Sequence, residues 1–220
     1  MKKIYGIGIG PGDPELITIK SHRLIRECDK VFVPCTKAKS TAQEIAAPYI
    51  EDKEVICLDF PMGEDNTAKY KAAAKEIDQV LKDGEKGVFL TLGDALVYST
   101  YAYLMKELQL RDIDVETFPG ITAFNAAASC VNMPLTIKDE SFYLCDGTLE
   151  DKVLEVVDTI CILKVNSRKE EIIDKLEKYG FDYLYVKRCS QEEQKILCQR
   201  ENILKDNDYM SLILAKKKKR

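Results

Sequence analysis

Apolar residues in the first half of the chain fall into short runs separated by amphipathic stretches. The predicted strands are residues 2–9, 31–34, 54–60, 87–93 and 114–118. The predicted helices, where apolar residues recur at helical spacing, are residues 15–28, 40–48, 66–83 and 98–110. This alternation of strand and helix predicts a largely parallel α/β sheet with right-handed crossovers.

The second half of the chain has a less regular pattern. Its predicted strands are residues 141–146, 159–165, 183–189, 195–200 and 209–215. Its predicted helices are residues 121–131, a weak one near 148–156, and 167–179. Turns rather than long helices separate the later strands, which favours a mixed sheet. We therefore expect two α/β domains: residues 1–117 with a mostly parallel sheet, and residues 118–220 with a mixed one.

Length and charge limit the classes of protein that fit. With 220 residues, the chain is long enough to bury a hydrophobic core without disulfides. The formal net charge of −4 argues against general nucleic-acid binding, which needs a basic face. No apolar run approaches the length that spans a bilayer, and the chain opens directly into a strand, so we expect a cytoplasmic protein away from membranes. The basic run at residues 216–220 is expected to be a solvated tail.

Cysteine and histidine usage argues against a metal site in the protein. None of the eight cysteines forms a C-x-x-C pair, so zinc-ribbon and iron–sulfur sites lack their ligand spacing. We expect all eight to be reduced and buried as small apolar residues. His22 is the only histidine, which excludes multi-histidine metal sites and a Ser-His-Asp triad with the usual roles. His22 is expected to be a surface or half-buried helix residue.

The first motif is the glycine-rich segment GIGIGPGDPELIT at residues 6–18. A strand, a glycine turn and a helix in sequence let the backbone approach a ligand closely, although a simple tight turn has the same composition. Gly6, Gly8 and Gly10 give G-x-G-x-G rather than the G-x-G-x-x-G of dinucleotide-binding folds. Glu51 and Asp52 precede a predicted strand, so neither fills the acidic ribose contact that follows one. A NAD-dependent oxidoreductase is therefore disfavoured.

The second motif, TLGDALVYSTYAYL at residues 91–104, joins the end of an apolar strand to a helix. Open α/β sheets bind ligands at the carboxyl ends of their strands, where Asp94 lies. Asp94 is either a ligand contact or a helix cap, and the local sequence leaves both open. Ser99 and Thr100 offer hydroxyl groups beside the exposed N–H groups of the helix start.

The third motif, FPGITAFNAAAS at residues 118–129, is a Pro-Gly turn followed by a helix of small residues. Small side chains allow close packing against a flat surface. That surface is either a ligand or, more commonly, a β-sheet.

These three motifs, in this order and at these separations, resemble the tetrapyrrole methylase family, and the resemblance covers nearly the whole chain. Within it, GDALVYSTYAYL and ILKVN look most like the members that methylate C20 of precorrin-2 or its cobalt complex in cobalamin biosynthesis. The resemblance implies two α/β domains with the active site in the cleft between them, and a homodimer. It also implies that S-adenosylmethionine is the methyl donor and a tetrapyrrole the substrate.

The resemblance implies the following site. The donor contacts are Leu92, Gly93, Asp94, Val97, Thr122 and Ala123 in the first domain, with Ser99 and Thr100 beside them, and Leu163, Lys164, Val165 and Cys189 in the second. The substrate contacts are Pro11, Gly12, Asp13 and Lys164, with Lys20, Arg23, Lys37 and Lys39 as further candidates for its carboxylates. The catalytic candidates, as acceptors of the substrate proton, are Asp94 and Tyr98, with bound water as a further alternative.

Two positions depart from the usual family pattern. Ala95 follows Gly93-Asp94 where the family often has proline, and Lys164 stands where many relatives carry methionine. Lys164 argues against a site of the uroporphyrinogen-methylating type in this chain and is more typical of the members that methylate C20.

The implied reaction is an in-line displacement of methyl from a sulfonium by an electron-rich carbon. Because the donor is already activated, the reaction requires no protein-bound metal. Three alternatives stay open: another position of a corrin precursor, a non-catalytic module that binds an adenosine ligand, and the related diphthine synthase type. The first loop argues against the diphthine synthase type, because its PGDP segment at residues 11–14 resembles the tetrapyrrole branch of the family. The sequence does not decide whether cobalt is already in the ring.

Overall fold

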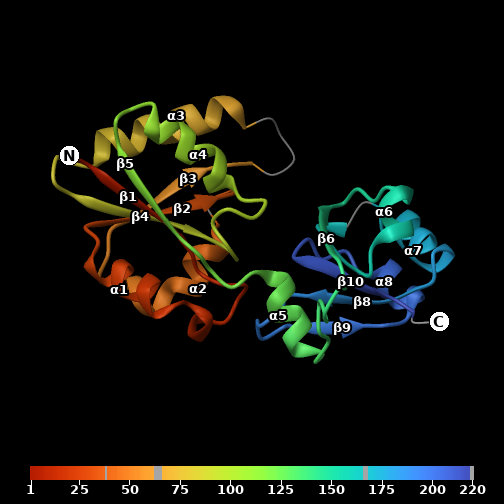
Figure 1. Cartoon of the computed structure of the whole chain (residues 1–220). Helices are drawn as coiled ribbons and strands as arrows, with labels where there is room; N and C mark the ends of the chain where they lie inside the picture. Colours follow the sequence, from red (N-terminus) through yellow and green to blue (C-terminus); the bar gives the residue numbers. More distant parts are fainter. Residues whose placement is uncertain (38, 62–65, 166–167, 219–220) are drawn as a thin grey trace. The chain divides into compact units, whose positions relative to one another are not determined.

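The chain forms two compact units (Figure 1). A computed structural model describes residues 1–37, 39–61, 66–165 and 168–218. The first unit is Met1–Thr122 and the second is Ala123–Arg220. Phe118, where the sequence pattern places the domain boundary, is the last residue of a strand, and the first unit continues to Thr122.

The first unit is built on a five-stranded sheet in the order β3-β2-β4-β1-β5. Its strands are β1 (Lys3–Gly8), β2 (Lys30–Cys35), β3 (Val55–Asp59), β4 (Lys86–Thr91) and β5 (Asp114–Phe118). Every strand pair in it is parallel, which confirms the predicted α/β sheet. The carboxyl ends of all five strands therefore lie at one edge of this sheet.

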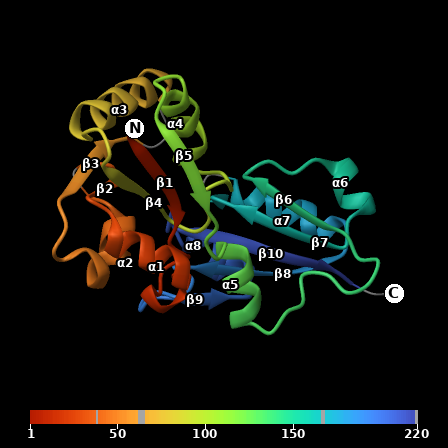
Figure 2. The same cartoon turned by 60° about the vertical axis from the view of Figure 1, so that its left-hand side comes forward.

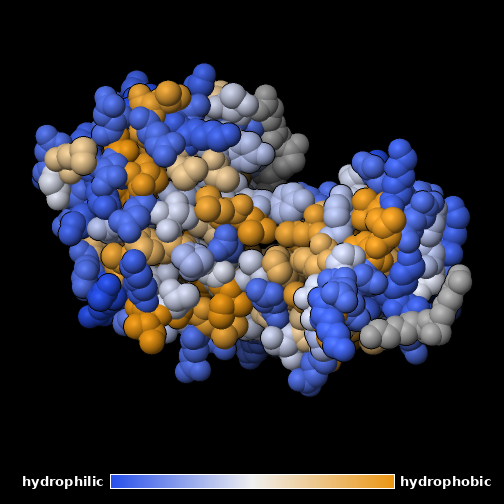
Figure 3. All heavy atoms as spheres, in the orientation of Figure 1, coloured by the Kyte–Doolittle hydropathy of each residue, from blue (hydrophilic) through white to orange (hydrophobic). Residues whose placement is uncertain are grey.

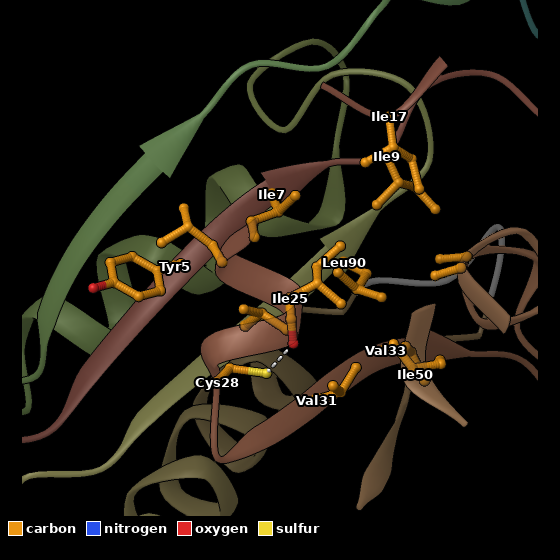
Figure 4. Close-up of a cluster of buried hydrophobic side chains, with 14 of the residues drawn as sticks. Tyr5, Ile7, Ile9, Ile17, Ile25, Cys28, Val31, Val33, Ile50 and Leu90 are labelled. Atoms are coloured by element: carbon orange, nitrogen blue, oxygen red, sulfur yellow. Dashed lines mark hydrogen bonds between the residues drawn. The ribbon is translucent and has the colours of Figure 1, made fainter. Parts of the chain in front are cut away.

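Helices cover both faces of this sheet (Figures 1 and 2). The helical elements are η1 (Pro14–Leu16), α1 (Ile19–Glu27), α2 (Thr41–Ile50), α3 (Thr67–Val80) and α4 (Thr100–Gln109). Successive strand residues point to opposite faces, so Leu90 joins the core under α1 and α2 while Phe89 joins the core under α3 and α4. Figure 4 shows the first of these cores, where Ile25 of α1 lies near Leu90 and Val33.

Two helix boundaries in the first unit differ from the sequence prediction. The helix expected at residues 15–28 begins only at Ile19, because Thr18 caps it by accepting a hydrogen bond from the Ser21 N–H (3.2 Å). The helix expected to end at Pro48 continues to Ile50. Proline removes one backbone donor, but Ile50 is buried in the core and holds the last turn in place.

The second unit has a mixed sheet in the order β6-β7-β10-β8-β9. Its strands are β6 (Phe142–Asp146), β7 (Thr159–Leu163), β8 (Phe181–Lys187), β9 (Lys195–Leu197) and β10 (Ser211–Lys217). Strands β6 and β7 are parallel and the other pairs are antiparallel, which confirms the predicted mixed sheet. Because β7 and β8 both run antiparallel to β10, the carboxyl ends of β6, β7 and β8 share one edge.

The described residues of the second unit form four α-helices: α5 (Ala123–Cys130), α6 (Asp151–Val156), α7 (Lys169–Lys178) and α8 (Arg200–Lys205). Helix α8 was not predicted, because residues 195–200 were expected to be one strand. The expected start of α7 at Ser167 lies outside the described residues. Across the described chain, no helix combines the length and the apolar character that crossing a membrane requires.

The expectation that all cysteines are reduced and buried is wrong for four of them. Cys35 and Cys57 form a disulfide between β2 and β3, and Cys130 and Cys198 are exposed thiols. The disulfide follows from strand register. Val33 lies opposite Cys57, so Cys35, two residues further along β2, is its diagonal neighbour on the same face.

The basic run at the carboxyl terminus is also more ordered than expected. Lys216 and Lys217 belong to β10. The Lys216 ammonium donates to the Glu140 carboxylate (2.8 Å), and the Lys217 ammonium donates to the Leu154 carbonyl (2.9 Å). The prediction of a solvated tail is therefore wrong for these two lysines, and residues 219–220 lie outside the described chain.

Candidate functional site

Glycines bring three backbone segments together at the carboxyl edge of the first sheet. Gly10 and Gly93 exchange two backbone hydrogen bonds, with N–O distances of 3.2 and 2.7 Å. A Cβ atom on Gly8 would lie 2.5 Å from the Gly120 nitrogen, and one on Gly120 would overlap the Gly93 carbonyl. The turns after β1, β4 and β5 thus approach too closely for side chains between them. We call this arrangement of Gly8, Gly10, Gly93 and Gly120 the glycine cradle.

Asp94 ties two turns of the cradle together. Its Oδ1 accepts a hydrogen bond from the Leu96 N–H (2.8 Å), and its Oδ2 accepts one from the Gly120 N–H (3.0 Å). The bond to Gly120 joins the turn after β4 to the turn after β5, which leads into Thr122 and Ala123. Asp94 is not the cap of α4, so its role is to fix the backbone of the cradle.

Ser99 is the residue that caps α4. Its hydroxyl accepts from the Ala102 N–H (3.2 Å) and donates to the Ala95 carbonyl. The buried Ser99 side chain is therefore committed to the helix start, while Thr100, the first residue of α4, is half-buried.

An exposed apolar surface lies beside the cradle. Leu92, Leu96 and Tyr98 are exposed, and Val97 is half-buried. Figure 3 shows apolar atoms interrupting the hydrophilic surface on the face drawn. A Cβ on Gly93 would meet no atom within 4 Å, so the cradle opens to free space at this residue. Tyr98 has a left-handed φ of 47°, which is rare for an aromatic residue and is concentrated at functional sites.

One buried hydroxyl at the end of β4 is unsatisfied. Thr91 is buried, and within the described residues its Oγ1 has no hydrogen-bond partner. An orphaned polar atom one residue before Leu92 identifies this strand end as a place where a bound molecule or water completes the hydrogen bonding.

The expected substrate loop offers less surface than its sequence suggests. Pro11 and Gly12 are buried. Asp13 is half-buried, and its carboxylate caps η1 by accepting from the Glu15 N–H (2.8 Å). Solvent-exposed side chains that could contact the substrate in this region must therefore belong to other residues.

The basic candidates of the first unit lie on two elements. Lys20 and Arg23 belong to α1, where the Lys20 ammonium sits 4.3 Å from the centre of the Phe118 ring. Lys37 and Lys39 are exposed in the loop after β2. His22, half-buried on α1 as expected, packs edge-on against Tyr49.

The small-residue helix of the third motif packs mainly on a sheet. Ala126, Ala127 and Ala128 of α5 are buried, and α5 contacts β10. Of the two surfaces considered for this motif, the β-sheet fits these alanines. Thr122 and Ala123, at its start, are half-buried.

In the second unit, the expected donor contacts lie at the carboxyl edge of β6, β7 and β8. Leu163 is half-buried and Lys164 is exposed. The Val165 side chain is fully buried in the core, so any contact to a ligand would come from its backbone. Cys189 is buried with its Sγ 4.0 Å from that of Cys130, and burial raises the pKa of Cys189 to about 12. Cys189 is therefore a neutral thiol at physiological pH.

Asp146 is a functional candidate that the sequence analysis missed. Its carboxylate forms an ion pair with Lys164 (3.2 Å). Lys164 has a left-handed φ of 53°, and its N–H donates to the Ser211 carbonyl (3.2 Å). Asp146 ends a run of apolar residues, and a carboxylate at the carboxyl end of a parallel strand is the signal that would have found it.

Further charged residues gather at this edge. Lys187 pairs with Asp206, and Arg188 pairs with Asp208 (2.6 Å). Lys169 is buried, and its ammonium has no hydrogen-bond partner within the described residues. Burial lowers the pKa of Lys169. In the described parts of both units, no group of three or more His, Cys, Asp or Glu side chains is arranged to hold a metal ion.

Comparison with known proteins places the chain in a family. The sequence profile of the family described as tetrapyrrole (corrin/porphyrin) methylases matches residues 3–203. The chain belongs to the tetrapyrrole methylase family. The resemblance first seen in three short motifs thus extends over most of the chain.

Two relatives indicate a branch of this family. The probable cobalt-precorrin-2 C(20)-methyltransferase of Methanocaldococcus jannaschii is 35% identical, and the alignment covers 100% of this chain and 98% of that protein. The cobalt-precorrin-2 C(20)-methyltransferase of Salmonella typhimurium is 30% identical over 81% of this chain and 79% of that protein.

A solved structure supports the fold of the methylase. The uroporphyrin-III C-methyl transferase of Thermus thermophilus, complexed with S-adenosyl homocysteine, superposes with a TM-score of 0.74. The match covers 97% of each chain at 20% sequence identity. The two-sheet architecture is therefore shared with a known methyltransferase of the family.

Proposed function

We propose that the protein transfers a methyl group from S-adenosylmethionine to C20 of cobalt-precorrin-2 or precorrin-2 in cobalamin biosynthesis. The observation that carries this proposal is the end-to-end similarity, at 35% identity, to a protein named for that reaction. The Salmonella relative bears the same reaction in its name. Both names include cobalt, which favours the cobalt complex as substrate.

The carboxyl edge of the first sheet fits the donor. The cradle opens at Gly93, apolar side chains flank it at Leu92 and Val97, and Thr91 supplies an unsatisfied hydroxyl. These features suit a ligand with a flat apolar part and polar atoms that reach the backbone. We assign Leu92, Gly93, Asp94 and Val97 to the donor, together with Thr122 and Ala123. Leu163, Lys164, Val165 and Cys189 stay proposed donor contacts of the second unit.

The work left to the protein is mainly positioning. The donor, when bound, supplies a methyl group already activated on a sulfonium. The cradle and Asp94 hold the binding surface rigid, and the exposed side chains of Leu96 and Tyr98 lie beside it. Holding two reactants in line contributes about 7–11 kcal/mol to such a reaction.

A proton must leave the methylated carbon. Both Asp94 oxygens already accept backbone hydrogen bonds, so Asp94 acts chiefly through the geometry of the cradle. Tyr98 is half exposed beside the cradle and adopts a left-handed φ of 47°. We therefore propose Tyr98 as the side chain that guides the proton away, with Asp94 as the positioning residue.

The substrate carries many carboxylates. Lys20, Arg23, Lys37 and Lys39 lie on α1 and on the loop after β2, and we propose that they bind these carboxylates. Pro11, Gly12 and Asp13 shape the loop beside them. We further propose a homodimer, from the family resemblance, a cytoplasmic location, from the sequence pattern, and a reaction that needs no protein-bound metal, because the donor is already activated.

A methyl-transfer assay tests this function. The protein receives labelled S-adenosylmethionine with either precorrin-2 or its cobalt complex, and calorimetry measures donor binding in parallel. Transfer to the cobalt complex at the higher kcat/KM is the expected result. Donor binding without transfer to either substrate would instead favour the non-catalytic adenosine-binding module, and absence of donor binding would contradict the proposal altogether.

A further inference from the structure

The ion pair of Asp146 and Lys164 is unusually open for its position. Among the described residues, three acid–base pairs lie at the carboxyl edge of β6, β7 and β8. The side chains of Lys187 and Asp206 are 18% and 12% exposed, and those of Arg188 and Asp208 are 35% and 14% exposed. In the third pair, Lys164 is 39% exposed and Asp146 is 34% exposed. This is the pair in which both charged groups are accessible to a ligand.

The backbone under this pair is fixed from three sides. The Gly147 N–H donates to the Leu163 carbonyl (3.1 Å), which joins the ends of β6 and β7. The Lys164 N–H donates to the Ser211 carbonyl (3.2 Å), which joins β7 to β10. Gly147 and Lys164 both adopt left-handed φ angles, of 66° and 53°. The hydrogen bonds among β6, β7 and β10, together with the strained backbone of Lys164, keep the two charges side by side.

The pairing of charges decides which ligand group fits. A carboxylate approaching Lys164 also approaches Asp146, so the attraction of one is offset by the repulsion of the other. Carboxylates of the substrate rim are therefore poor partners for this pair. A group that carries an ammonium and a carboxylate on one carbon satisfies both side chains at once.

We propose that Asp146 and Lys164 recognise the α-amino-acid end of the methyl donor. Asp146 accepts hydrogen bonds from its ammonium, and Lys164 donates to its carboxylate. The proposal rests on the proposed function, since it assumes that the donor is S-adenosylmethionine. It adds Asp146 to the site and assigns Lys164 to the donor instead of the substrate.

Two ligands separate this role from a general effect on the fold. S-Adenosylhomocysteine has the amino-acid end, and 5′-methylthioadenosine lacks it. Calorimetry on the whole protein compares both ligands for the wild type, Asp146→Asn and Lys164→Met. Each substitution should lower the affinity for S-adenosylhomocysteine about ten- to hundredfold, because a hydrogen bond to a charged group is lost. Binding of 5′-methylthioadenosine should change less than about twofold.

Controls test the charge and the fold. Asp182→Asn makes the same chemical change in an ion pair with Lys218 at the opposite end of β8, and should leave both ligands unaffected. Asp146→Glu keeps the carboxylate and should recover most of the lost affinity. Circular dichroism and thermal unfolding show that each variant is folded before it is titrated.

Other outcomes would overturn the inference. Equal loss of both ligands would mean that the pair supports the fold or the adenosine part. Unchanged binding of both, with a raised KM for the tetrapyrrole, would assign the pair to the substrate. Failure of the wild type to bind either ligand would contradict the proposed function itself, whereas wild-type binding with unaffected variants would contradict only this inference.

Discussion

The two sheets of this methylase build their carboxyl edges from different materials. In the first unit the edge is main chain, with three turns packed through glycines and held by Asp94. In the second unit the described part of the edge carries charged side chains, arranged in three ion pairs. A backbone cradle gives close approach and fixed geometry, while paired charges give selection by charge. The difference suggests that one protein divides positioning and charge recognition between its two halves.

Filling the glycine cradle should have the largest effect. In Gly120→Val, the new side chain would overlap the Gly93 carbonyl and the backbone of Gly8. We expect the first unit to lose about 3 kcal/mol or more of unfolding free energy, together with donor binding. Urea denaturation and calorimetry measure the two effects. Gly180→Val, whose Cβ meets no atom within 4 Å, controls for the substitution, although its φ of 75° adds some strain. Equal losses in both variants would argue against a crowded cradle.

Opening the disulfide should have the next largest effect and should be confined to the first unit. Cys35 and Cys57 are 22 residues apart, and a disulfide that closes a loop of that length stabilises a fold by about 3 kcal/mol. A reductant should therefore lower the unfolding free energy of the first unit by about that amount. Thiol titration of the denatured protein should give six free thiols before reduction and eight after it. Eight thiols before reduction would show that the bond is absent.

Removing the carboxylate that holds the cradle should weaken donor binding as well as the fold of the first unit. Asp94→Ala removes the acceptor for two backbone N–H groups. Water can replace the acceptor of the exposed Leu96 N–H, whereas loss of the part-buried bond to Gly120 costs about 1–3 kcal/mol. We expect donor affinity to fall at least tenfold by calorimetry. Asp94→Asn keeps one acceptor oxygen and should be intermediate. Wild-type affinity in the alanine variant would contradict the placement of the donor at this edge.

The smallest expected effect concerns the buried Lys169 and has the opposite sign. Burial lowers its pKa below the ordinary 10.5, so the unfolded chain binds more protons. Its contribution to stability therefore rises with pH, from the lowered pKa up to 10.5. Lys169→Met should stabilise the protein by about 1 kcal/mol or more at pH 7 and reduce this pH dependence. Urea denaturation between pH 7 and pH 10 measures both quantities.

The exposed Lys152 on α6 offers the matched control. Lys152→Met should leave the free energy of unfolding nearly unchanged across the same pH range. If Lys169→Met destabilised the protein instead, the ammonium would have a stabilising partner. Lys169 would then not be an unsatisfied buried group.

The fold was largely predictable because its signals are local. Runs of apolar residues located the strands, and the end of the apolar strand at Gly93 and Asp94 predicted a binding position at the carboxyl edge of the first sheet. What failed depended on tertiary contacts. The Cys35–Cys57 bond requires the register of β2 and β3, which no spacing along the chain encodes.

The site was less predictable than the fold because its residues act through contacts between distant positions of the chain. Asp94 stood out from its position, but its bond to Gly120 joins residues 26 positions apart. Asp146 was missed because its candidate role depends on its ion pair with Lys164, which directly follows the neighbouring strand β7. Lys216 was taken as solvated because its partner Glu140 is 76 positions away along the chain. Pairings across strands decide these roles, and they become visible only in three dimensions.

The position of the transferred methyl group tests the central claim most directly. The protein is incubated with cobalt-precorrin-2 and S-adenosylmethionine carrying a ¹³C-labelled methyl group, and the product is examined by NMR. The account predicts one new ¹³C methyl signal, attached to C20. A signal at another carbon would keep the family and contradict the proposed reaction, and a bound donor with no labelled product would contradict the enzymatic role.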